Sequence, residues 1–212
     1  NEAPAGKFGR VIAHGAQFEF ERRPGVSQRF YGVNLCFGAN YLRPDESATL
    51  ARRLARIGYN AIRIHHYESI LAPDSDAPAA LDPVRLGELD ALMAACVSNG
   101  LYMTTDLFVS RKVSWRACGV DRPGLVGMDE YKELVRVSPA AYSNFLAFAR
   151  ALLTHVNPYT GRRWADEPAL AWLAFVNENN PGNRGTRLYR DNPMAHAAWV
   201  RWLAAKKAST PG

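Results

Sequence analysis

Residues 167–178 read EPALAWLAFVNE, and this stretch decides the fold class. Every residue from Pro168 to Val176 is apolar, so the stretch has no polar face, which is typical of a strand buried on both sides of a parallel sheet. The run stops at Asn177 and Glu178. Because active sites of parallel α/β folds lie at the carboxyl ends of strands, a Glu half surrounded by apolar wall is a candidate general acid. The plain alternative is that both residues merely open a polar loop.

The rest of the chain alternates strand patterns with amphipathic helical patterns. The expected strands are 29–34, 60–65, 101–107 and the run quoted above. The helices are expected to begin after Asp45, which can cap the first one, and at Asp82-Pro83, Ser138-Pro139 and Asn192-Pro193. Residues 108–137 read as one long loop. Four such units are half of a (β/α)8 barrel, which takes roughly 250 residues when complete.

An extra segment precedes the first unit. Residues 11–13 and 18–21 flank a turn-like sequence and predict a β-hairpin that caps the bottom of a barrel. We therefore predict an α/β fold of the (β/α)8 TIM-barrel type, with the first four strand-helix units at 29–212 and a hairpin segment at 1–28. The helical faces, including Trp199 and Trp202 on the last helix, are expected to pack on the sheet.

Three motifs in this order resemble one family. A hydrophobic strand ending in Asn177-Glu178, the segment YNAIRIHHY at 59–67 and the segment FYGVN at 30–34 are similar to strands four, two and one of the clan A retaining glycoside hydrolases. Cellulases, β-mannanases and β-galactosidases belong to that clan. The resemblance implies that Glu178 is the acid/base and that Asn177 binds the sugar hydroxyl next to the anomeric carbon. It also implies a substrate-binding role for Arg63, for a following His and for Asn34.

Two histidines are candidates for the substrate-binding His that the resemblance implies. His65 has the same strand parity as Arg63 and would face the barrel interior with it, whereas the family match favours His66, three residues after the Arg. Either one would equally serve as a hydrogen-bonded histidine near the core. A metal bound by the pair has no third ligand at a recognisable spacing, so no metal or other cofactor is expected.

The family's nucleophile is a second Glu after the seventh strand, and no carboxylate here matches its position. Retaining hydrolysis needs two carboxyl groups roughly 5 to 5.5 Å apart. Asp106, at the end of the third strand, is the nearest substitute, and hydrogen bonding within the site is the role expected of it. Trp115 in the long loop is a candidate for stacking on a sugar ring, or an anchor of the loop. Asn179, Asn180 and Asn183 supply further amides, or simply form a turn.

The composition of the chain adds little to the prediction of its function. The formal charge of +6 comes mostly from scattered Arg without a nucleic-acid-binding signature, so no nucleic acid partner is expected, and no stretch is long and apolar enough to span a membrane. The chain starts at Asn1, which suggests processing or excision. Cys96 reads as a core residue, while a Cys36–Cys118 bridge is compatible with an exported protein. A secreted or periplasmic location is favoured, and the sequence does not decide it.

The function expected is retaining hydrolysis of a β-linked glycan or glycoside, active only once a C-terminal half supplies the nucleophile. A non-hydrolytic carbohydrate-binding or structural half-barrel is the alternative. If the 212 residues are the whole molecule, a second copy or a segment of another chain is expected to complete the barrel, since an open sheet leaves unpaired edges.

Overall fold

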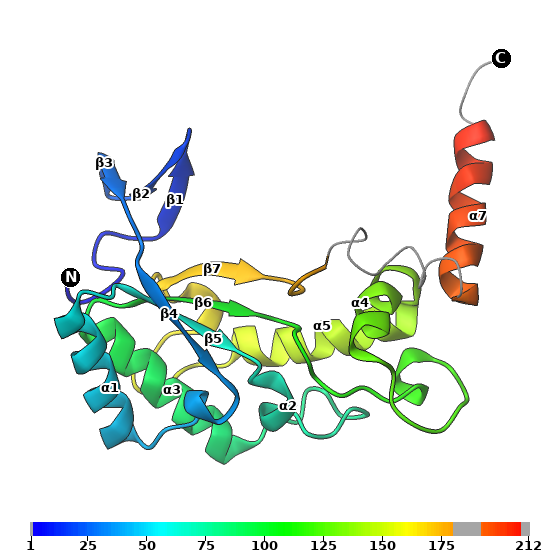
Figure 1. The fold of residues 1–212 in the computed structure, drawn as a ribbon, viewed down its shortest axis with the longest axis horizontal. Helices are drawn as coiled ribbons and strands as arrows, with labels where there is room; N and C mark the ends of the chain where they lie inside the picture. The colour runs from blue at the N-terminus through cyan, green and yellow to red at the C-terminus, as the bar shows by residue number, and fades with distance from the viewer. Residues whose placement is uncertain (1, 180–191, 209–212) are drawn as a thin grey trace.

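The computed structural model describes residues 2–179 and 192–208, and its centre is a four-stranded parallel sheet. The strands lie in the order of the chain and are β4 (Gly32–Cys36), β5 (Ala61–His65), β6 (Tyr102–Asp106) and β7 (Leu170–Ala174). Figure 1 shows them running side by side in one direction. The predicted class is confirmed: the chain forms part of a (β/α) barrel, with an antiparallel sheet before it.

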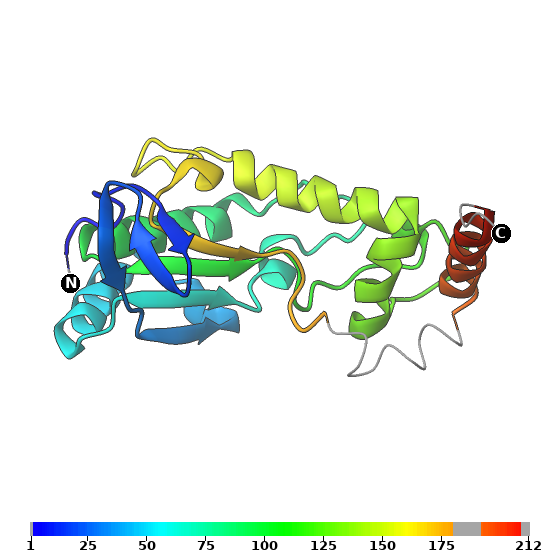
Figure 2. The ribbon, with the colours of Figure 1, turned by 90° about the horizontal axis from the view of Figure 1, so that it is seen from above.

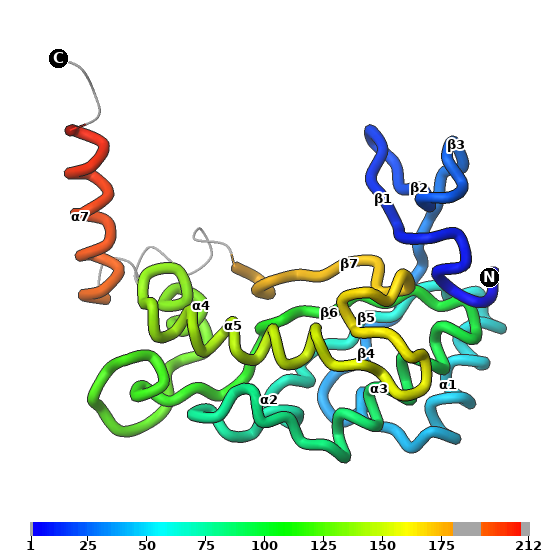
Figure 3. The backbone as a smooth tube through the Cα atoms, turned by 180° about the vertical axis from the view of Figure 1, so that it is seen from behind, coloured from blue at the N-terminus to red at the C-terminus, as the bar shows by residue number. Residues whose placement is uncertain are grey.

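Helices cover one face of this sheet, as can be followed in the view of the molecule from behind (Figure 3). The covering helices are α1 (Pro44–Ile57), α3 (Pro83–Ser98) and α5 (Pro139–Thr154). Outward-facing strand residues such as Ile62, Ile64 and Met103 are at most 1% exposed beneath them. Each such side chain contributes roughly 1.5–3 kcal/mol through burial, which explains why the helices pack there.

Helix starts follow their capping residues. Asp82 caps α3 by accepting the N–H groups of Val84 and Arg85, and Ser138 caps α5, as the sequence predicts. The first helix differs from the prediction because it begins at Pro44, before Asp45. Its first turn is closed by Glu46, whose carboxylate accepts the Arg43 N–H at 3.0 Å.

The N-terminal segment forms a three-stranded antiparallel sheet of β1 (Val11–His14), β2 (Gln17–Phe20) and β3 (Arg23–Gln28), so the predicted hairpin gains a third strand. It lies at the amino ends of the parallel strands (Figure 1). Phe18 stacks edge-on against Trp172 with ring centroids 5.2 Å apart, and Phe20 stacks on Tyr102 at 5.1 Å. These aromatic rings close the bottom of the half-barrel.

The expected loop at 108–137 contains two helices that the sequence analysis missed. They are a 3-10 turn η2 (Arg116–Cys118) and the helix α4 (Met128–Val137). Tyr131, Leu134 and Val135 are buried, which is the helical spacing of an amphipathic segment, but the charged residues between them hide the pattern. A short helix α2 (Glu68–Leu71) and a 3-10 turn η1 (Phe37–Asn40) follow strands β5 and β4, and η3 (Trp164–Asp166) precedes β7.

The strand that decides the fold is less buried than its sequence predicts. No residue of β7 is fully buried, Ala174 is exposed, and the next residue, Phe175, is 69% exposed. The physical reason is position: β7 is the edge of the sheet and pairs only with β6. The prediction of a strand buried on both sides was therefore wrong for this chain.

The last helix, α7 (Pro193–Ala208), does not pack on the sheet as expected. Figure 2 shows it beyond α4, at the carboxyl ends of the strands. Asn192 donates to Glu130 of α4 at 3.1 Å, while Trp199 and Trp202 stack on each other and are each at least half exposed. No helix in the described ranges is both long enough and apolar enough to span a membrane.

Candidate active site

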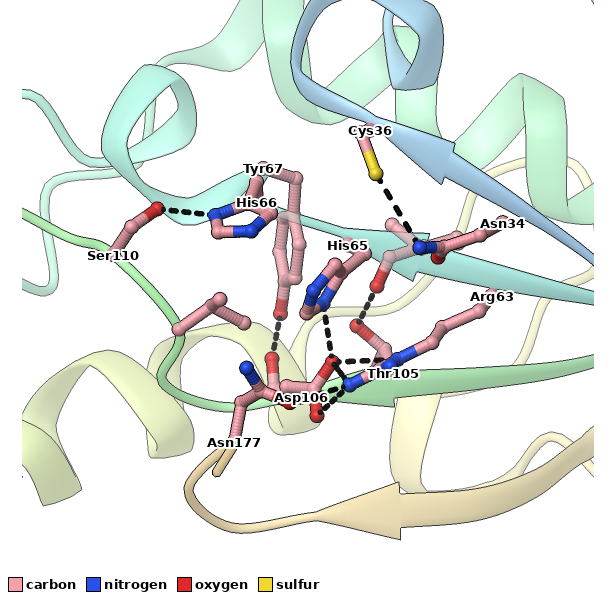
Figure 4. A network of polar contacts seen from close by, with 12 residues as sticks. Asn34, Cys36, Arg63, His65, His66, Tyr67, Thr105, Asp106, Ser110 and Asn177 are labelled. Atoms are coloured by element: carbon pink, nitrogen blue, oxygen red, sulfur yellow. Dashed lines mark hydrogen bonds and ion pairs between the residues drawn. The ribbon is translucent and has the colours of Figure 1, made fainter. Parts of the chain in front are cut away.

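A cluster of polar side chains lies at the carboxyl ends of the four parallel strands, drawn in Figure 4. The strand register sets it up, because Asn34 pairs with Arg63 and Cys36 pairs with His65. Residues in register on neighbouring strands have their side chains on the same face. Asn34, Arg63 and His65 therefore share the inner face of the sheet with Asp106 of β6.

Asp106 is the centre of the cluster and is 1% exposed. Arg63 approaches it with two nitrogens, Nη2 at 2.8 Å from Oδ1 and Nε at 3.1 Å from Oδ2, which is the strong two-pronged geometry of an Arg-carboxylate pair. Nδ1 of His65 lies 2.9 Å from Oδ2. Because a carboxylate only accepts, Nδ1 of His65 carries the hydrogen, and Nε2 is left as the other functional nitrogen.

Arg63 also joins Asp106 to the strand-end amide. Its Nη2 donates to Oδ1 of Asn177 at 2.8 Å, and the Asn177 N–H donates to the Phe108 carbonyl at 2.9 Å. With its oxygen engaged, Asn177 keeps its Nδ2 donor for another partner. Figure 4 shows Asn177 turned toward Asp106 from the segment after β7. The sequence placed these residues in one site, and the structure brings them together.

His66 lies beside His65, with ring centroids 4.3 Å apart. Its backbone has a left-handed φ of 51°, its ring stacks on Phe37 at 4.7 Å, and its Nδ1 lies 2.8 Å from the Ser110 hydroxyl. Desolvation, followed by the neighbouring charge of His65, lowers the pKa of His66 below its usual value, so the neutral ring is favoured. Both histidines therefore lie at the site, His65 inside the cluster and His66 at its edge.

Glu178 is exposed and has a left-handed φ of 49°. The expectation that apolar wall half surrounds its side chain is not met, since β7 has a neighbour on one side only. Glu178 and Asp106 are the carboxylates that follow or end strands β7 and β6, and Asp106 is already engaged by Arg63 and His65. Asn34 is exposed and donates to Sγ of Cys36 at 3.4 Å.

Trp115 makes its contacts within its own loop. It is 5% exposed, and its backbone N–H donates to the Gly124 carbonyl at 3.1 Å. The Arg122 guanidinium lies 4.0 Å from its ring centre. These contacts are those of a loop anchor, the alternative that the sequence left open. Sugar stacking by Trp115 stays a prediction that this burial does not favour.

Glu68 holds the segment that follows β6. It is fully buried, and its Oε1 accepts the N–H groups of Val109, Ser110 and Arg111, the last at 3.2 Å. The segment after β6 is thereby fixed, and with it the Ser110 hydroxyl that contacts His66. Sequence reasoning missed Glu68, Ser110 and Phe37, because a left-handed φ and a contact across 41 residues leave no local signal.

The described part of the chain contains neither a metal-binding cluster nor a disulfide. It contains no group of three or more His, Cys, Asp or Glu side chains placed to hold a metal ion. All three cysteines are free, so Cys36 and Cys118 are not bridged. Burial raises the pKa of the Cys118 thiol to about 11 and that of Cys96 to about 12, which keeps both thiols protonated at neutral pH. Asn180 and Asn183 lie outside the described residues.

A parallel sheet with helices on one face and a polar cluster at the carboxyl ends of its strands defines half of a (β/α)8 barrel. No family model matches the sequence, and no curated protein matches it either. Solved structures do match. The chain superimposes on an endo-1,4-β-mannanase from Rhizomucor miehei with a TM-score of 0.59 and 17% identity, covering 80% of this chain and 48% of that one.

Two further structures give the same result. An endo-β-1,4-mannanase from Thermotoga petrophila matches with a TM-score of 0.53 and 19% identity, over 71% of this chain and 35% of that one. A family 5 mannosidase variant from Rhizomucor miehei matches with a TM-score of 0.55 and 14% identity, over 87% and 53%. The chain thus spans about half of the length of these proteins or less. At this identity the likeness establishes the fold.

Proposed function

We propose that this chain carries the acid/base half of a retaining glycoside hydrolase that acts on a β-linked glycan. The observation that carries the proposal is the Asn177-Glu178 pair after β7, tied through Arg63 to the buried Asp106. The proteins of similar fold named above are mannanases and a mannosidase, so β-1,4-linked mannan oligosaccharides are the first substrates to test.

In the proposed reaction Glu178 donates its proton to the glycosidic oxygen as the bond to the anomeric carbon breaks. A second carboxylate attacks the anomeric carbon from the opposite face and forms a covalent glycosyl ester. Glu178 then takes a proton from water, which displaces the ester with net retention. The Nδ2 of Asn177 is free to bind the neighbouring hydroxyl, with Arg63 fixing its orientation.

The nucleophile is proposed to come from a C-terminal half that completes the barrel. Asp106 is a poor candidate because its oxygens already accept from Arg63 and His65. Both edges of the sheet carry apolar grooves that suit a completing half. The groove of about 640 Å³ between α4, α5 and the segment after β7 includes Phe145, Leu146 and Phe175. The groove of about 480 Å³ between β4 and α1 includes Leu35, Leu42 and Leu50.

A non-hydrolytic carbohydrate-binding or structural half-barrel is the second candidate. It is favoured by one observation: Asp106, the other strand-end carboxylate, is already engaged by Arg63 and His65. Calorimetric binding of mannan oligosaccharides to the completed protein, with no reducing ends released during prolonged incubation, would establish this candidate instead.

The test uses the protein completed with a C-terminal half and compares Glu178→Gln with Glu88→Gln. Glu88 is a suitable control because its carboxylate, on α3, pairs with Arg85 at 2.9 Å, and its side chain is 19% exposed. We expect Glu178→Gln to lower turnover of mannan oligosaccharides about 10²–10⁴-fold, the usual contribution of a general acid, and Glu88→Gln to leave it unchanged. Equal turnover in both variants would refute the assignment, and NMR of the first-formed anomer tests retention.

A further inference from the structure

We infer that Arg136 of α4 is a positioning residue for Glu178, acting through Asn179. The inference rests on the proposed function, because it assumes that Glu178 is the acid/base. Arg136 lies far from the strand-end motifs in sequence, in the segment that the sequence alone marks as a loop. Figure 2 shows α4 beside the end of the segment that follows β7.

The guanidinium of Arg136 is bonded to Asn179 at two points. Its Nη2 donates to the Asn179 carbonyl at 3.1 Å and also to the Asn179 side-chain Oδ1. A planar guanidinium that contacts both a carbonyl and an amide oxygen of one residue fixes that residue in position and in orientation.

Arg136 also forms an ion pair within its own helix α4. Nη1 of Arg136 lies 3.2 Å from Oε2 of Glu133, one turn earlier on the same helix, and the Glu133 side chain is only 8% exposed. The Arg136 side chain is 31% exposed. An ion pair with one nearly buried member is held more tightly than a pair of two solvated side chains.

Glu178 thus lies between two asparagines that are each held by a different arginine. Arg63 of β5 holds Asn177 on one side, and Arg136 holds Asn179 on the other. Between them Glu178 adopts the left-handed φ of 49°, which non-glycine residues rarely adopt and which persists only where the surroundings impose it. The two arginines supply that restraint.

A purely structural anchor would explain the same contacts, and leaving-group dependence separates the two roles. Loss of acid catalysis slows the cleavage of glycosides with poor leaving groups and spares activated ones, which leave without protonation. A general loss of structure lowers kcat/KM for both. Misplacement of a catalytic group by about 1 Å costs up to about 10²-fold in rate.

The experiment measures kcat/KM of the completed protein on two matched mannosides, one with an alkyl and one with a dinitrophenyl leaving group. For Arg136→Gln we expect a loss of about 10- to 100-fold on the alkyl mannoside and less than about 3-fold on the activated one. Arg136→Lys, which keeps the charge without the planar fork, should fall between. Arg85→Gln is the control, since Arg85 also pairs with a helix carboxylate at spacing three and lies outside the site.

Asn179→Ala is the second variant and guards against misfolding of Arg136→Gln. It removes the Oδ1 acceptor and keeps the carbonyl, so a smaller loss with the same selectivity is expected. Equal losses on both mannosides, or none, would overturn the inference if Glu178→Gln in the same assay is selectively impaired. If Glu178→Gln is itself unimpaired, the proposed function fails and the inference fails with it.

Discussion

Arg63 and Asp106 form a two-pronged ion pair across the strands β5 and β6, with Nη2 2.8 Å from Oδ1 and Nε 3.1 Å from Oδ2. The Asp106 side chain is 1% exposed and that of Arg63 is 35% exposed. Through this pair, His65 of β5 and Asn177 after β7 are joined to Asp106 of β6. Its integrity therefore decides both the local stability and the orientation of Asn177.

Asp106→Asn tests this pair. The substitution keeps the shape but removes the carboxylate, leaving Arg63 and His65 with weakened acceptors. We expect a loss of about 2 to 3 kcal/mol in the free energy of unfolding, in the range measured for buried charged hydrogen bonds. Urea unfolding measures it, with Glu88→Gln, which removes the carboxylate of a partly exposed ion pair on α3, as the control. Equal stability of the two variants would show that the ion pair contributes nothing.

Titration of His66 provides a pH-dependent prediction. Desolvation lowers the pKa of His66 from its ordinary value of 6.5 in the folded state, so the unfolded chain binds the proton more readily. Above pH 6.5 His66 is neutral in both states, and its burial does not oppose folding. As the pH falls from 6.5 through the folded pKa, the unfolded chain takes up the proton first, and the free energy of unfolding decreases. NMR titration should give a His66 pKa below 6.5, with His66→Gln identifying the resonance. A value at or above 6.5 would contradict the described burial.

Removal of Glu68 should loosen the segment after β6. Glu68→Ala leaves three N–H groups, those of residues 109–111, without their acceptor, and two of them, at 109 and 111, are buried. We expect a loss of at least about 2 kcal/mol in the free energy of unfolding, because each orphaned buried donor is costly. Hydrogen exchange at residues 109–111 should speed up more than exchange in β5. Uniform acceleration across the sheet would mean that the effect is global.

The isolated 212 residues should associate. The edge strands β4 and β7 each lack one neighbour among the described residues. Phe175 and Tyr142, which line the groove between α4, α5 and the segment after β7, are 69% and 49% exposed. Sedimentation at micromolar concentration should show dimers or larger species. Phe175→Glu should weaken association, whereas Tyr159→Glu should not, since Tyr159 is 57% exposed but lies outside that groove. A cooperative, well-folded monomer would contradict this prediction.

Much of the architecture can be predicted from the sequence because it depends on local patterns. The apolar runs that became β5 and β6 and the caps at Asp82 and Ser138 act within a few residues, and the structure has them where expected. Strand parity correctly placed His65 with Arg63 on the inner face. These features need no knowledge of distant contacts.

The remaining features depend on position in the fold. The burial of β7 was overestimated because composition does not reveal that a strand is an edge. Helix α4 was missed because its apolar residues are interrupted by charges, two of which, Lys132 and Glu133, are themselves nearly buried. The support that Glu68 and Arg136 give to the site comes from contacts more than 40 residues apart, at 41 and 43. No local rule predicts such pairs.

Azide rescue of Glu178→Ala in the completed protein tests the central claim most directly. Without the acid/base, an activated mannoside still forms the glycosyl intermediate, which then waits for a nucleophile that needs no deprotonation. We predict that azide accelerates turnover of the dinitrophenyl mannoside and yields a glycosyl azide with the anomeric configuration of the substrate. Unchanged turnover without azide, or no azide product in an impaired variant, would contradict the assignment of Glu178 as the acid/base.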